Sequence, residues 1–360
     1  MKNNYALIMA GGIGSRFWPI SRTSYPKQFI DILGTGKTLI QQTYDRFKNI
    51  VPEENIFILT NEIYSDLVLE QIPGMDKSRI LCEPVMRNTA PCIAYGCHKI
   101  NKLNPDAAIV VSPSDHLILN NEEFINCINK SLKTASDNDC LITLGIKPSR
   151  PDTGYGYIQY NTQKIDDDFY KVKTFTEKPN LELARTFVQS GDFLWNAGIF
   201  VWSVRNILYS FRKHLPEIND IFNEGSAVYN TDKETEFIQT AFTQCTNISI
   251  DYGIMEKAEN VYVLPSEFGW SDLGTWASVY ELAEKDYVGN AVIPSEKVIM
   301  YDSSNCMVNV PEGKVVILQG LHDFIVVEAN NTLLICPRDR EQQIKQVVTD
   351  VKQRFGSDFI

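Results

Sequence analysis

The segment Ala10-Gly-Gly-Ile-Gly-Ser-Arg16 follows directly on the apolar run from Tyr5 to Met9. A buried strand that runs into a glycine-rich turn leaves several backbone N–H groups free to bind one anion, because glycine permits positive φ angles and close approach. Arg16 adds a planar guanidinium, and Lys27 adds a compact ammonium a little further along the chain. The segment therefore predicts a polyphosphate-binding loop after the first strand of an α/β fold.

Two other phosphate-binding motifs do not fit this chain. The dinucleotide fingerprint GxGxxG requires a third glycine where Arg16 or Phe17 stands, and no acidic residue ends a clear second strand at the expected distance. The segment Gly34-Thr-Gly-Lys-Thr38 resembles the end of the nucleoside triphosphatase loop, but the first glycine of that motif would fall at Asp31. We interpret this second segment as the turn that opens a helix from Leu39 to Ile50.

The composition is that of an ordinary globular protein. The chain has 360 residues, of which 44% are hydrophobic, enough for a large α/β domain and a smaller appendage. The net charge of −11 and the lack of a basic stripe argue against nucleic acid as a partner, although Arg16, Lys27 and Arg22 would form a local positive pocket. With no long apolar run, no leader sequence, and eight cysteines that lack disulfide or zinc spacing, we expect a cytoplasmic protein that does not enter membranes.

Apolar strands alternate with helical stretches through the first 150 residues. We expect strands at 6–9, 56–60, 107–112 and 141–145, separated by helices near 38–50, 61–72, 90–103 and 122–136. Such alternation is typical of a doubly wound, mostly parallel sheet, whose ligands bind beyond the carboxyl ends of its strands. The glycine loop lies at such an end, and so does Ser112-Pro-Ser-Asp-His116, which places Asp115 at the same rim.

The pattern of predicted secondary structure changes twice in the rest of the chain. From 151 to 288 we expect antiparallel strands that cap the crevice at 153–157, 172–178 and 196–202, helices at 181–190, 204–215, 235–243 and 250–258, and a loop centred on 268–274. From 289 to 360 short apolar segments recur every eight or nine residues, which predicts a small β-solenoid-like domain and a terminal helix over 339–353. The predicted domains are 1–288, in two parts that meet at 150/151, and 289–360.

Three further segments accompany the glycine loop in the order found in one family. They are Glu83-Pro-Val-Met-Arg-Asn-Thr-Ala-Pro91, Phe175-Thr-Glu-Lys-Pro179 and Trp270-Ser-Asp-Leu-Gly-Thr-Trp276. Together with Arg16-Phe-Trp-Pro19 they resemble the mannose-1-phosphate guanylyltransferases over nearly the whole chain. Relatives that load thymidylate or uridylate usually carry Leu and no Trp in the stretch after the loop. The resemblance implies the Rossmann-like fold of nucleotide-diphospho-sugar transferases, with nucleotide bound by 1–150 and sugar by 151–288.

The resemblance also implies a reaction. GMP would pass from GTP to mannose 1-phosphate, giving GDP-mannose and pyrophosphate, by in-line attack of the sugar phosphate on the α-phosphorus. Two alternatives stay open, namely a nucleotidyltransferase for another sugar 1-phosphate or base, and a noncatalytic regulatory subunit of the same fold. We expect no isomerase activity on hexose 6-phosphates, because the chain lacks a metal-binding histidine cluster. Exposed strand edges after Asn290 would suit a homo-oligomer, and they would equally suit a cover over the catalytic domain.

The predicted site residues fall into sets by role. The catalytic residues are Arg16, Lys27 and Lys178; the nucleotide-binding residues are Ala10, Gly11, Gly12, Gly14, Ser15, Glu83, Arg87, Asn88, Thr89 and Ser114; and the sugar-binding residues are Gly154, Tyr155, Gly156, Glu177 and Asn196. Glycine N–H groups, the serine hydroxyl and the cations suit phosphates, whereas carboxylate and amide groups suit sugar hydroxyls. Asn88 or Thr89 would also serve as an ordinary helix cap, and Tyr155, Tyr157, Trp195 and Trp202 would also serve as core.

Asp115 and Asp272 are the predicted metal ligands, because the family uses such a pair to bind Mg²⁺. Two carboxylates that meet without a cation repel by about 4 kcal/mol at 4 Å and an effective dielectric constant of 20. A divalent ion turns this repulsion into attraction, and hard oxygen ligands suit Mg²⁺ better than Zn²⁺. His116 is expected to pack or to form a hydrogen bond. Glu177 and Lys178 would face opposite sides of a strand unless a turn before Pro179 redirects one of them.

Overall fold

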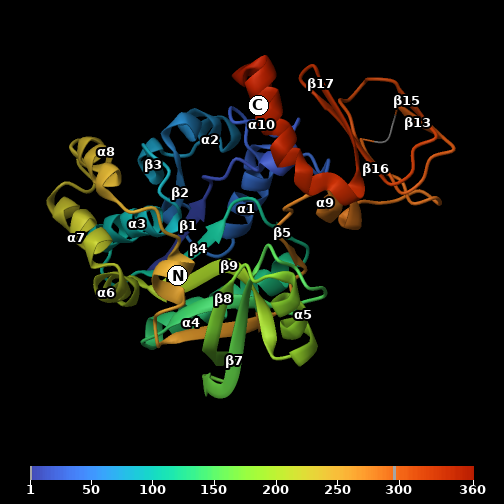
Figure 1. Ribbon diagram of the computed structural model, residues 1–360. Coiled ribbons are helices and arrows are strands. Elements are labelled where there is room, and N and C mark those ends of the chain that lie inside the picture. The colour runs from blue at the N-terminus through green and yellow to red at the C-terminus, as the bar shows by residue number, and fades with distance from the viewer. Residues whose placement is uncertain (1, 295–296) are drawn as a thin grey trace. The chain divides into compact units, whose positions relative to one another are not determined.

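The computed structural model describes residues 2–294 and 297–360, which form two compact units (Figure 1). The first unit comprises the chain up to Gly11, Thr43–Ser114 and Ile118–Trp270; the second comprises Gly12–Gln42, Asp115–Leu117 and Ser271–Ile360. The chain passes from one unit to the other within the glycine loop, within helix α1 (Leu39–Phe47), and around the short strands β5 (Leu117–Ile118) and β11 (Trp270–Ser271).

The first unit is built on a nine-stranded sheet in the order β3-β2-β1-β4-β9-β6-β10-β8-β7. Strands β1 (Asn4–Met9), β2 (Ile56–Asn61), β3 (Ile80–Glu83) and β4 (Ala108–Pro113) are parallel, as are β6 (Leu141–Ile146) and β10 (Val261–Ser266). Strands β7 (Gly156–Ile165), β8 (Phe169–Glu177) and β9 (Phe193–Ser203) run antiparallel to their neighbours.

Helices cover both faces of this sheet, which confirms the doubly wound prediction. The helices are α2 (Ser65–Gln71), α3 (Thr89–Leu103), α4 (Asn121–Asp137), α5 (Leu181–Ser190), α6 (Val204–His214), α7 (Pro216–Glu224) and α8 (Glu234–Gln244). One apolar cluster joins alternate strand residues such as Leu7 and Val111 to α3, α6, α7 and α8, which lie side by side in Figure 1. None of the described residues of α4 belongs to that cluster, and α4 packs on β4, β6, β9 and β10. It therefore covers the opposite face.

Two predictions for the middle of the chain need correction. The strand expected at 196–202 is present as β9, but it does not cap the crevice, because it lies inside the sheet between β4 and β6. Phe200 and Trp202 are at most 2% exposed, and a strand covered on both faces requires such a continuous apolar run. The helix expected at 250–258 is a π-helical turn over Asp251–Met255. Sequence patterns also did not indicate β3, which is short, or α7, which begins at Pro216 directly after α6.

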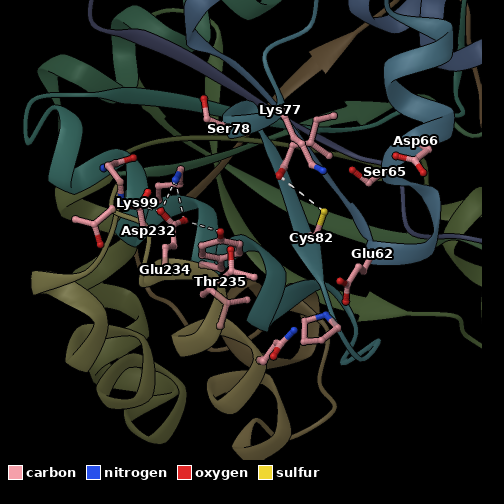
Figure 2. Close-up of a pocket in the computed structure, with 17 residues that line it drawn as sticks. Glu62, Ser65, Asp66, Lys77, Ser78, Cys82, Lys99, Asp232, Glu234 and Thr235 are labelled. Atoms are coloured by element: carbon pink, nitrogen blue, oxygen red, sulfur yellow. Dashed lines mark hydrogen bonds and ion pairs between the residues drawn. The ribbon is translucent and has the colours of Figure 1, made fainter.

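A buried ion pair in the first unit makes a sharp prediction about stability. Lys99 Nζ binds the two carboxylate oxygens of Glu234 at 2.7 and 2.6 Å, in the wall of a cavity of about 930 Å³ (Figure 2). We expect Lys99→Met to lower the free energy of unfolding by about 3–5 kcal/mol, because the Glu234 carboxylate stays buried without a cation. Urea unfolding measures this loss. Lys130→Met, which loses only an exposed pair with Asp168, is the control and should change stability by less than about 1 kcal/mol. Equal losses in both variants would contradict the prediction.

The second unit contains the C-terminal strands. Strands β12 (Ala291–Ile293), β14 (Met307–Asn309) and β16 (Phe324–Ala329) pair in parallel, and so do β13 (Val298–Tyr301) and β15 (Val316–Gln319). Parallel stacking of short strands from successive turns is the pattern of a β-solenoid, as predicted. Strand β17 (Thr332–Pro337) pairs antiparallel with β16, and α9 (Trp276–Leu282) and α10 (Ile344–Phe355) complete the unit. The expected terminal helix is confirmed, with a 3₁₀ first part over Arg338–Gln343.

The core of the second unit connects the glycine loop to the C-terminal strands. Phe17 and Trp18 belong to one apolar cluster with Trp276 of α9, Met307 of β14 and Ile344 of α10. The residues after the loop are thus packed against the last quarter of the chain. Over the described parts of the chain, no helix combines the length and apolar character needed to cross a bilayer.

Candidate active site

The glycine loop begins where β1 ends, and its conformation explains the glycine at position 14. Gly14 has a φ of 67°, and a Cβ on it would collide with the Cβ of Lys27. Only glycine satisfies both the left-handed backbone and the close passage of the Lys27 side chain. Gly12 is exposed, and a Cβ on it would meet nothing within 4 Å, so this residue is not required by packing. Ser15 opens the 3₁₀ turn Ser15–Phe17 and, like Gly12, is not buried.

Lys27 brings together residues that are far apart in the sequence. Its ammonium donates to the main-chain oxygens of Asp272 at 2.9 Å and Leu273 at 3.2 Å, and it pairs with Asp115 Oδ2 at 2.7 Å. The lysine is 4% exposed, so the alternative of a simple surface lysine is wrong. Burial acts to raise the pKa of Asp115, but the charges of Lys27 and His116 outweigh it, and the pKa lies below its ordinary value. Asp115 is therefore ionised at neutral pH.

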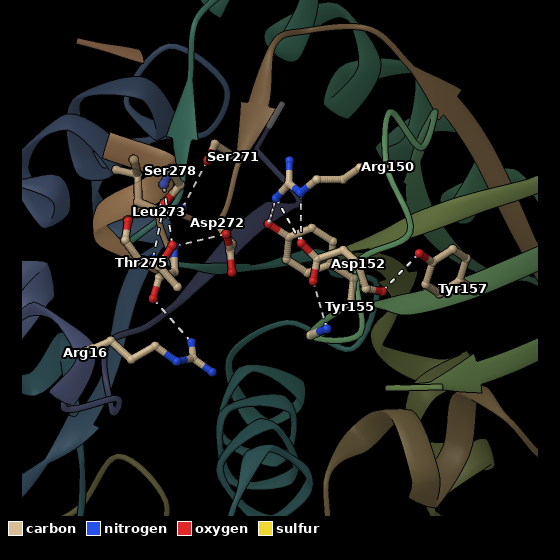
Figure 3. Close-up of polar contacts among 12 residues, drawn as sticks. Arg16, Arg150, Asp152, Tyr155, Tyr157, Ser271, Asp272, Leu273, Thr275 and Ser278 are labelled. Atoms are coloured by element: carbon tan, nitrogen blue, oxygen red, sulfur yellow. Dashed lines mark hydrogen bonds and ion pairs between the residues drawn. The ribbon is translucent and has the colours of Figure 1, made fainter. Parts of the chain in front are cut away.

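Arg16 lies in the same unit as this lysine. Figure 3 shows its side chain directed at the loop that carries Asp272, where Nη1 donates to the main-chain oxygen of Gly274 at 3.2 Å. Arg16 Nε is buried and has no hydrogen-bond partner among the described residues. A buried donor without an acceptor is unfavourable, and an anion would satisfy it. Arg22 differs from the expectation of a shared positive pocket, because its guanidinium donates to main-chain oxygens far along the chain, those of Asn330 at 3.0 Å and Asp358 at 2.9 Å.

The donor set of this cluster fits Mg²⁺ when a nucleotide supplies further oxygens. Among residues 2–294 and 297–360, no three His, Cys, Asp or Glu side chains form a metal-binding group. The contacts of Lys27 nevertheless place Asp115 and Asp272 next to each other, since one ammonium binds the Asp115 carboxylate and the Asp272 main-chain oxygen. The Asp272 carboxylate itself accepts from the Gly274 N–H at 3.0 Å. Carboxylate oxygens from these two residues, with phosphate oxygens and water at the remaining positions, would be the hard ligands that Mg²⁺ prefers.

A second group of predicted residues lies within the first unit at the end of β8. Lys178 has a φ of 47°, which is uncommon for a residue with a side chain, and its ammonium pairs with the neighbouring Glu177 carboxylate. This supplies the turn expected before Pro179, and both side chains point the same way. A Cβ on Gly156 would collide with Glu177 Oε2. Glycine at this position therefore leaves room for the carboxylate.

Asp251 extends this group, and sequence reasoning missed it. Asn196 Nδ2 donates to Asp251 Oδ1 at 3.0 Å, while Asn196 Oδ1 accepts from Thr143 at 3.0 Å. Burial raises the pKa of Asp251 to about 7, and the nearby charge of Glu177 adds to the effect. The sequence signal that could have indicated Asp251 is its position as the one acidic residue in the segment Ile250–Met255. In the structure this segment forms a π-helical turn, a feature often found at functional sites.

The loop before β7 is held by Arg150 and Asp152. The Arg150 guanidinium binds Asp152 Oδ2 through two nitrogens at 2.9 and 3.1 Å and stacks 5.9 Å from the ring centre of Tyr155 (Figure 3). The Gly154 N–H, expected to face a sugar, donates instead to Asp152 Oδ1 at 2.8 Å. Tyr155 packs edge-on against Trp195 at 4.9 Å, while Tyr157, Trp195 and Trp202 are buried, so the core alternative holds for these three.

Glu83 ends β3 beside the start of the glycine loop. Its carboxylate lies 3.8 Å from where a Cβ of Gly11 would stand, and the residue is 6% exposed. Burial raises the pKa of Glu83 to about 8, so the carboxyl is largely protonated at neutral pH and can donate a hydrogen bond. Ala10 continues β1 by donating to the main-chain oxygen of Leu59 at 2.7 Å, and Ser114 is 1% exposed.

The residues after Glu83 make structural bonds. Arg87 Nε donates to the main-chain oxygen of Phe242 at 3.2 Å, near the end of α8. Asn88 is the N-cap of α3, with a φ of 68° and its side chain accepting from the Thr89 N–H. Thr89 Oγ1 accepts from the Ile250 N–H at 2.8 Å. Asn88 therefore has the role of an ordinary helix cap, which was the alternative to nucleotide binding.

Comparison with known proteins adds independent information. The family model "Nucleotidyl transferase" matches residues 5–288, and "MannoseP isomerase/GMP-like beta-helix domain" matches 296–351. The chain is 35% identical to a mannose-1-phosphate guanylyltransferase of Klebsiella pneumoniae over 98% of this chain and 75% of that protein. It is also 35% identical to the alginate biosynthesis protein AlgA of Pseudomonas aeruginosa, over 98% of this chain and 73% of the relative.

Solved structures agree with the sequence relatives. A crystal structure described as mannose-1-phosphate geranyltransferase, from Thermus thermophilus, matches with a TM-score of 0.86 and 30% identity over 97% of this chain and 99% of that one. A structure described as mannose-6-phosphate isomerase, from Helicobacter pylori, matches with a TM-score of 0.62 and 27% identity over 75% of this chain and 99% of that one. The fold of both units is thus found in a known protein of nearly the same extent.

Proposed function

Because the chain belongs to the nucleotidyl transferase family, we propose that it transfers GMP from GTP to mannose 1-phosphate, giving GDP-mannose and pyrophosphate. Similarity over nearly the whole chain to proteins named mannose-1-phosphate guanylyltransferase supports this choice of base and sugar. The observation that carries the proposal is the cluster around Lys27, where one buried ammonium meets Asp115 and the Asp272 backbone. In the same unit Arg16 keeps a buried donor without a partner among the described residues.

The reaction needs positioning more than it needs a side-chain nucleophile. The sugar phosphate is anionic at neutral pH, and its oxygen attacks the α-phosphorus in line while pyrophosphate departs. Loop N–H groups and the Ser15 hydroxyl bind the triphosphate, and the Arg16 guanidinium neutralises charge on the departing pyrophosphate. Lys178 binds the phosphate of the sugar, and Glu177 with Asn196 binds its hydroxyls. Correct orientation of two anions contributes on the order of 7–11 kcal/mol to the rate acceleration.

We further propose Mg²⁺ as the cofactor, with Asp115 and Asp272 as its protein ligands. A bound Mg²⁺ neutralises phosphate charge and orients the nucleotide. Asp115 suits the role because its pKa lies below the ordinary value, so it is an anion at neutral pH without any metal. Lys27 fixes the position of both acidic residues by binding one carboxylate and one backbone.

The test is a pyrophosphate-release assay on the purified full chain. GTP, ATP, UTP and dTTP are each combined with mannose, glucose and galactose 1-phosphates in the presence of Mg²⁺. We expect kcat/KM for GTP with mannose 1-phosphate to exceed every other pair by about tenfold or more, the equivalent of about 1.4 kcal/mol. Preference for another pair would establish the alternative substrate, and no release with any pair would favour the noncatalytic alternative. Conversion of fructose 6-phosphate, measured in parallel, would overturn the expectation of no isomerase activity.

Gly156→Ala tests the assignment of Glu177 to the sugar. A Cβ on Gly156 would collide with Glu177 Oε2 and displace the carboxylate, so one charge-assisted hydrogen bond to the sugar is lost. Such a bond contributes about 1.5–3 kcal/mol, and we expect KM for mannose 1-phosphate to rise roughly 10- to 100-fold while KM for GTP stays unchanged. Initial-rate kinetics with each substrate varied in turn measure both constants.

Three further variants make this test specific. Thr174→Ala, at an exposed position on β8, the strand that carries Glu177, is the control and should leave both constants unchanged. Glu177→Gln should raise the same KM, and the double variant should show less than the sum of the two effects because both act on one carboxylate. Additive effects would show that Gly156 acts by another route.

A further inference from the structure

Two side chains after the glycine loop bind the last residues of the chain. Trp18 and Arg22 belong to the stretch Phe17-Trp-Pro-Ile-Ser-Arg22, and they are only 4% and 9% exposed. Trp18 Nε1 donates to the main-chain oxygen of Phe359 at 2.7 Å, and Arg22 Nη1 donates to that of Asp358 at 2.9 Å. The stretch that follows the glycine loop is therefore bonded to residues 358 and 359.

Arg22 also ties this contact to the turn between β16 and β17. Its Nη2 donates to the main-chain oxygen of Asn330 at 3.0 Å and to the Thr332 hydroxyl at 3.1 Å. These partners and the main-chain oxygen of Asp358 are neutral, so the guanidinium acts here as a fork of donors and not through a salt bridge. The buried Arg22 side chain thus connects the segment after the glycine loop to the β16–β17 turn and to Asp358.

Short hydrogen-bonded turns connect these contacts to Arg16. The Phe17 N–H donates to the main-chain oxygen of Gly14 at 3.0 Å, and Ser21 Oγ donates to the same oxygen at 2.6 Å. The Phe17 ring packs edge-on against Trp276 at 5.2 Å, next to the loop of Gly274. Gly14 and Arg16 therefore belong to the same compact, hydrogen-bonded stretch of backbone as Trp18 and Arg22.

We propose that residues 356–360, here called the C-terminal tail, brace the segment 14–22, and that Trp18 and Arg22 are positioning residues for Arg16. Ordering each residue of such a segment has an entropic cost of about 1–2 kcal/mol, which bonds to buried groups offset. Here two buried donors hold the tail, and they come from the segment that presents the catalytic guanidinium. The inference rests on the proposed function only for the role of Arg16.

Four variants test the brace. They are a chain ending at Phe355, Trp18→Phe, Arg22→Met and Arg22→Lys. Trp18→Phe keeps an aromatic ring in the core but removes the donor to Phe359, so it separates bonding from packing. We expect kcat to fall about tenfold or more in the shortened chain and in Arg22→Met, and less in Trp18→Phe, because small displacements of catalytic groups reduce rates steeply. KM for mannose 1-phosphate should stay within about twofold, and Arg22→Lys should recover only part of the rate.

Amide hydrogen exchange supplies a readout that does not depend on activity. In the variants, exchange of the amides in 14–22 should become faster while that of β1 and β4 stays as in the parent chain. Arg354→Met, which changes an exposed residue of α10 next to the tail, is the matched control and should alter neither rate nor exchange. If the shortened chain does not fold, Trp18→Phe decides the question.

The outcomes separate the brace from the proposed function. An active enzyme whose kcat and loop exchange are unchanged in Trp18→Phe and in the shortened chain would overturn the brace. A uniform rise in exchange over the whole sheet would also overturn it, because the tail would then only stabilise the fold. A parent chain without transferase activity whose 14–22 exchange still responds to the variants would overturn the proposed function and leave the brace standing.

Discussion

Replacing Arg16 by alanine is expected to lower kcat by about 10²- to 10³-fold, while KM for mannose 1-phosphate stays within about twofold. The guanidinium neutralises charge that grows on the pyrophosphate as the bond to the α-phosphorus breaks, so its contribution is larger in the transition state than in the ground state. Its Nε is a buried donor without a partner among the described residues, ready for a phosphate oxygen. Steady-state kinetics with pyrophosphate release as the readout measure both constants.

Controls decide whether the loss is chemical or structural. Arg340→Ala removes an exposed arginine from the same unit and should leave kcat unchanged. Arg16→Lys keeps a positive charge without the planar fork and should recover part of the rate. Thermal unfolding of the Arg16 variants should shift only slightly from that of the parent chain, because loss of the hydrogen bond to the Gly274 oxygen costs on the order of 1 kcal/mol. Unchanged turnover in Arg16→Ala would remove its assigned role.

Local sequence patterns predicted the elements around the loop well. The apolar run to Met9 and the glycines after it specify a strand and a left-handed turn through short-range sterics alone, and β1 and Gly14 have these conformations. The failure at β9 has a long-range cause. The apolar run of β9 indicates a strand that is covered on both faces, but it does not say where in a sheet the strand lies. That position is set by pairing with β4 and β6, which are distant in the sequence.

The pair Asp115 and Asp272 was expected from the family resemblance, and Lys27 was expected on the phosphates. In the structure Lys27 pairs with the Asp115 carboxylate and donates to the main-chain oxygen of Asp272. The metal and phosphate roles of these residues stay predictions. Arg22 was expected in the same positive pocket because a short spacing and a like charge suggested it. Two of its hydrogen bonds go instead to the main-chain oxygens of Asn330 and Asp358, far along the chain, and backbone acceptors leave no mark in a sequence.

The surroundings of the acidic side chains give them different pKa values, although their residue types are alike. Burial raises the pKa of Glu83 to about 8 and that of Asp251 to about 7, whereas the Lys27 charge holds the pKa of Asp115 below its ordinary value. At neutral pH Asp115 is therefore an anion, while Glu83 is largely a neutral donor. This difference supports assigning Asp115 to a cation and Glu83 to hydrogen bonding with a base.

The second large effect is expected at Asp272. Asp272→Asn removes one anionic ligand but keeps the main-chain oxygen that accepts from Lys27 at 2.9 Å, so the lysine should stay in place. We expect the Mg²⁺ concentration for half-maximal activity to rise about tenfold, the equivalent of about 1.4 kcal/mol. Asp115→Asn should have a larger effect, because it also breaks the ion pair with Lys27 at 2.7 Å. Activity is measured over a Mg²⁺ titration at saturating GTP.

A direct binding measurement separates metal binding from turnover. Mn²⁺ binding in the presence of GTP, followed by electron paramagnetic resonance, should weaken in both variants and remain unchanged in Asp339→Asn, an exposed acidic position of the same unit. The order of the two effects is informative, because a carboxylate that only stabilised Lys27 would weaken turnover without shifting the metal titration. An unaltered titration in Asp272→Asn would therefore exclude Asp272 as a metal ligand.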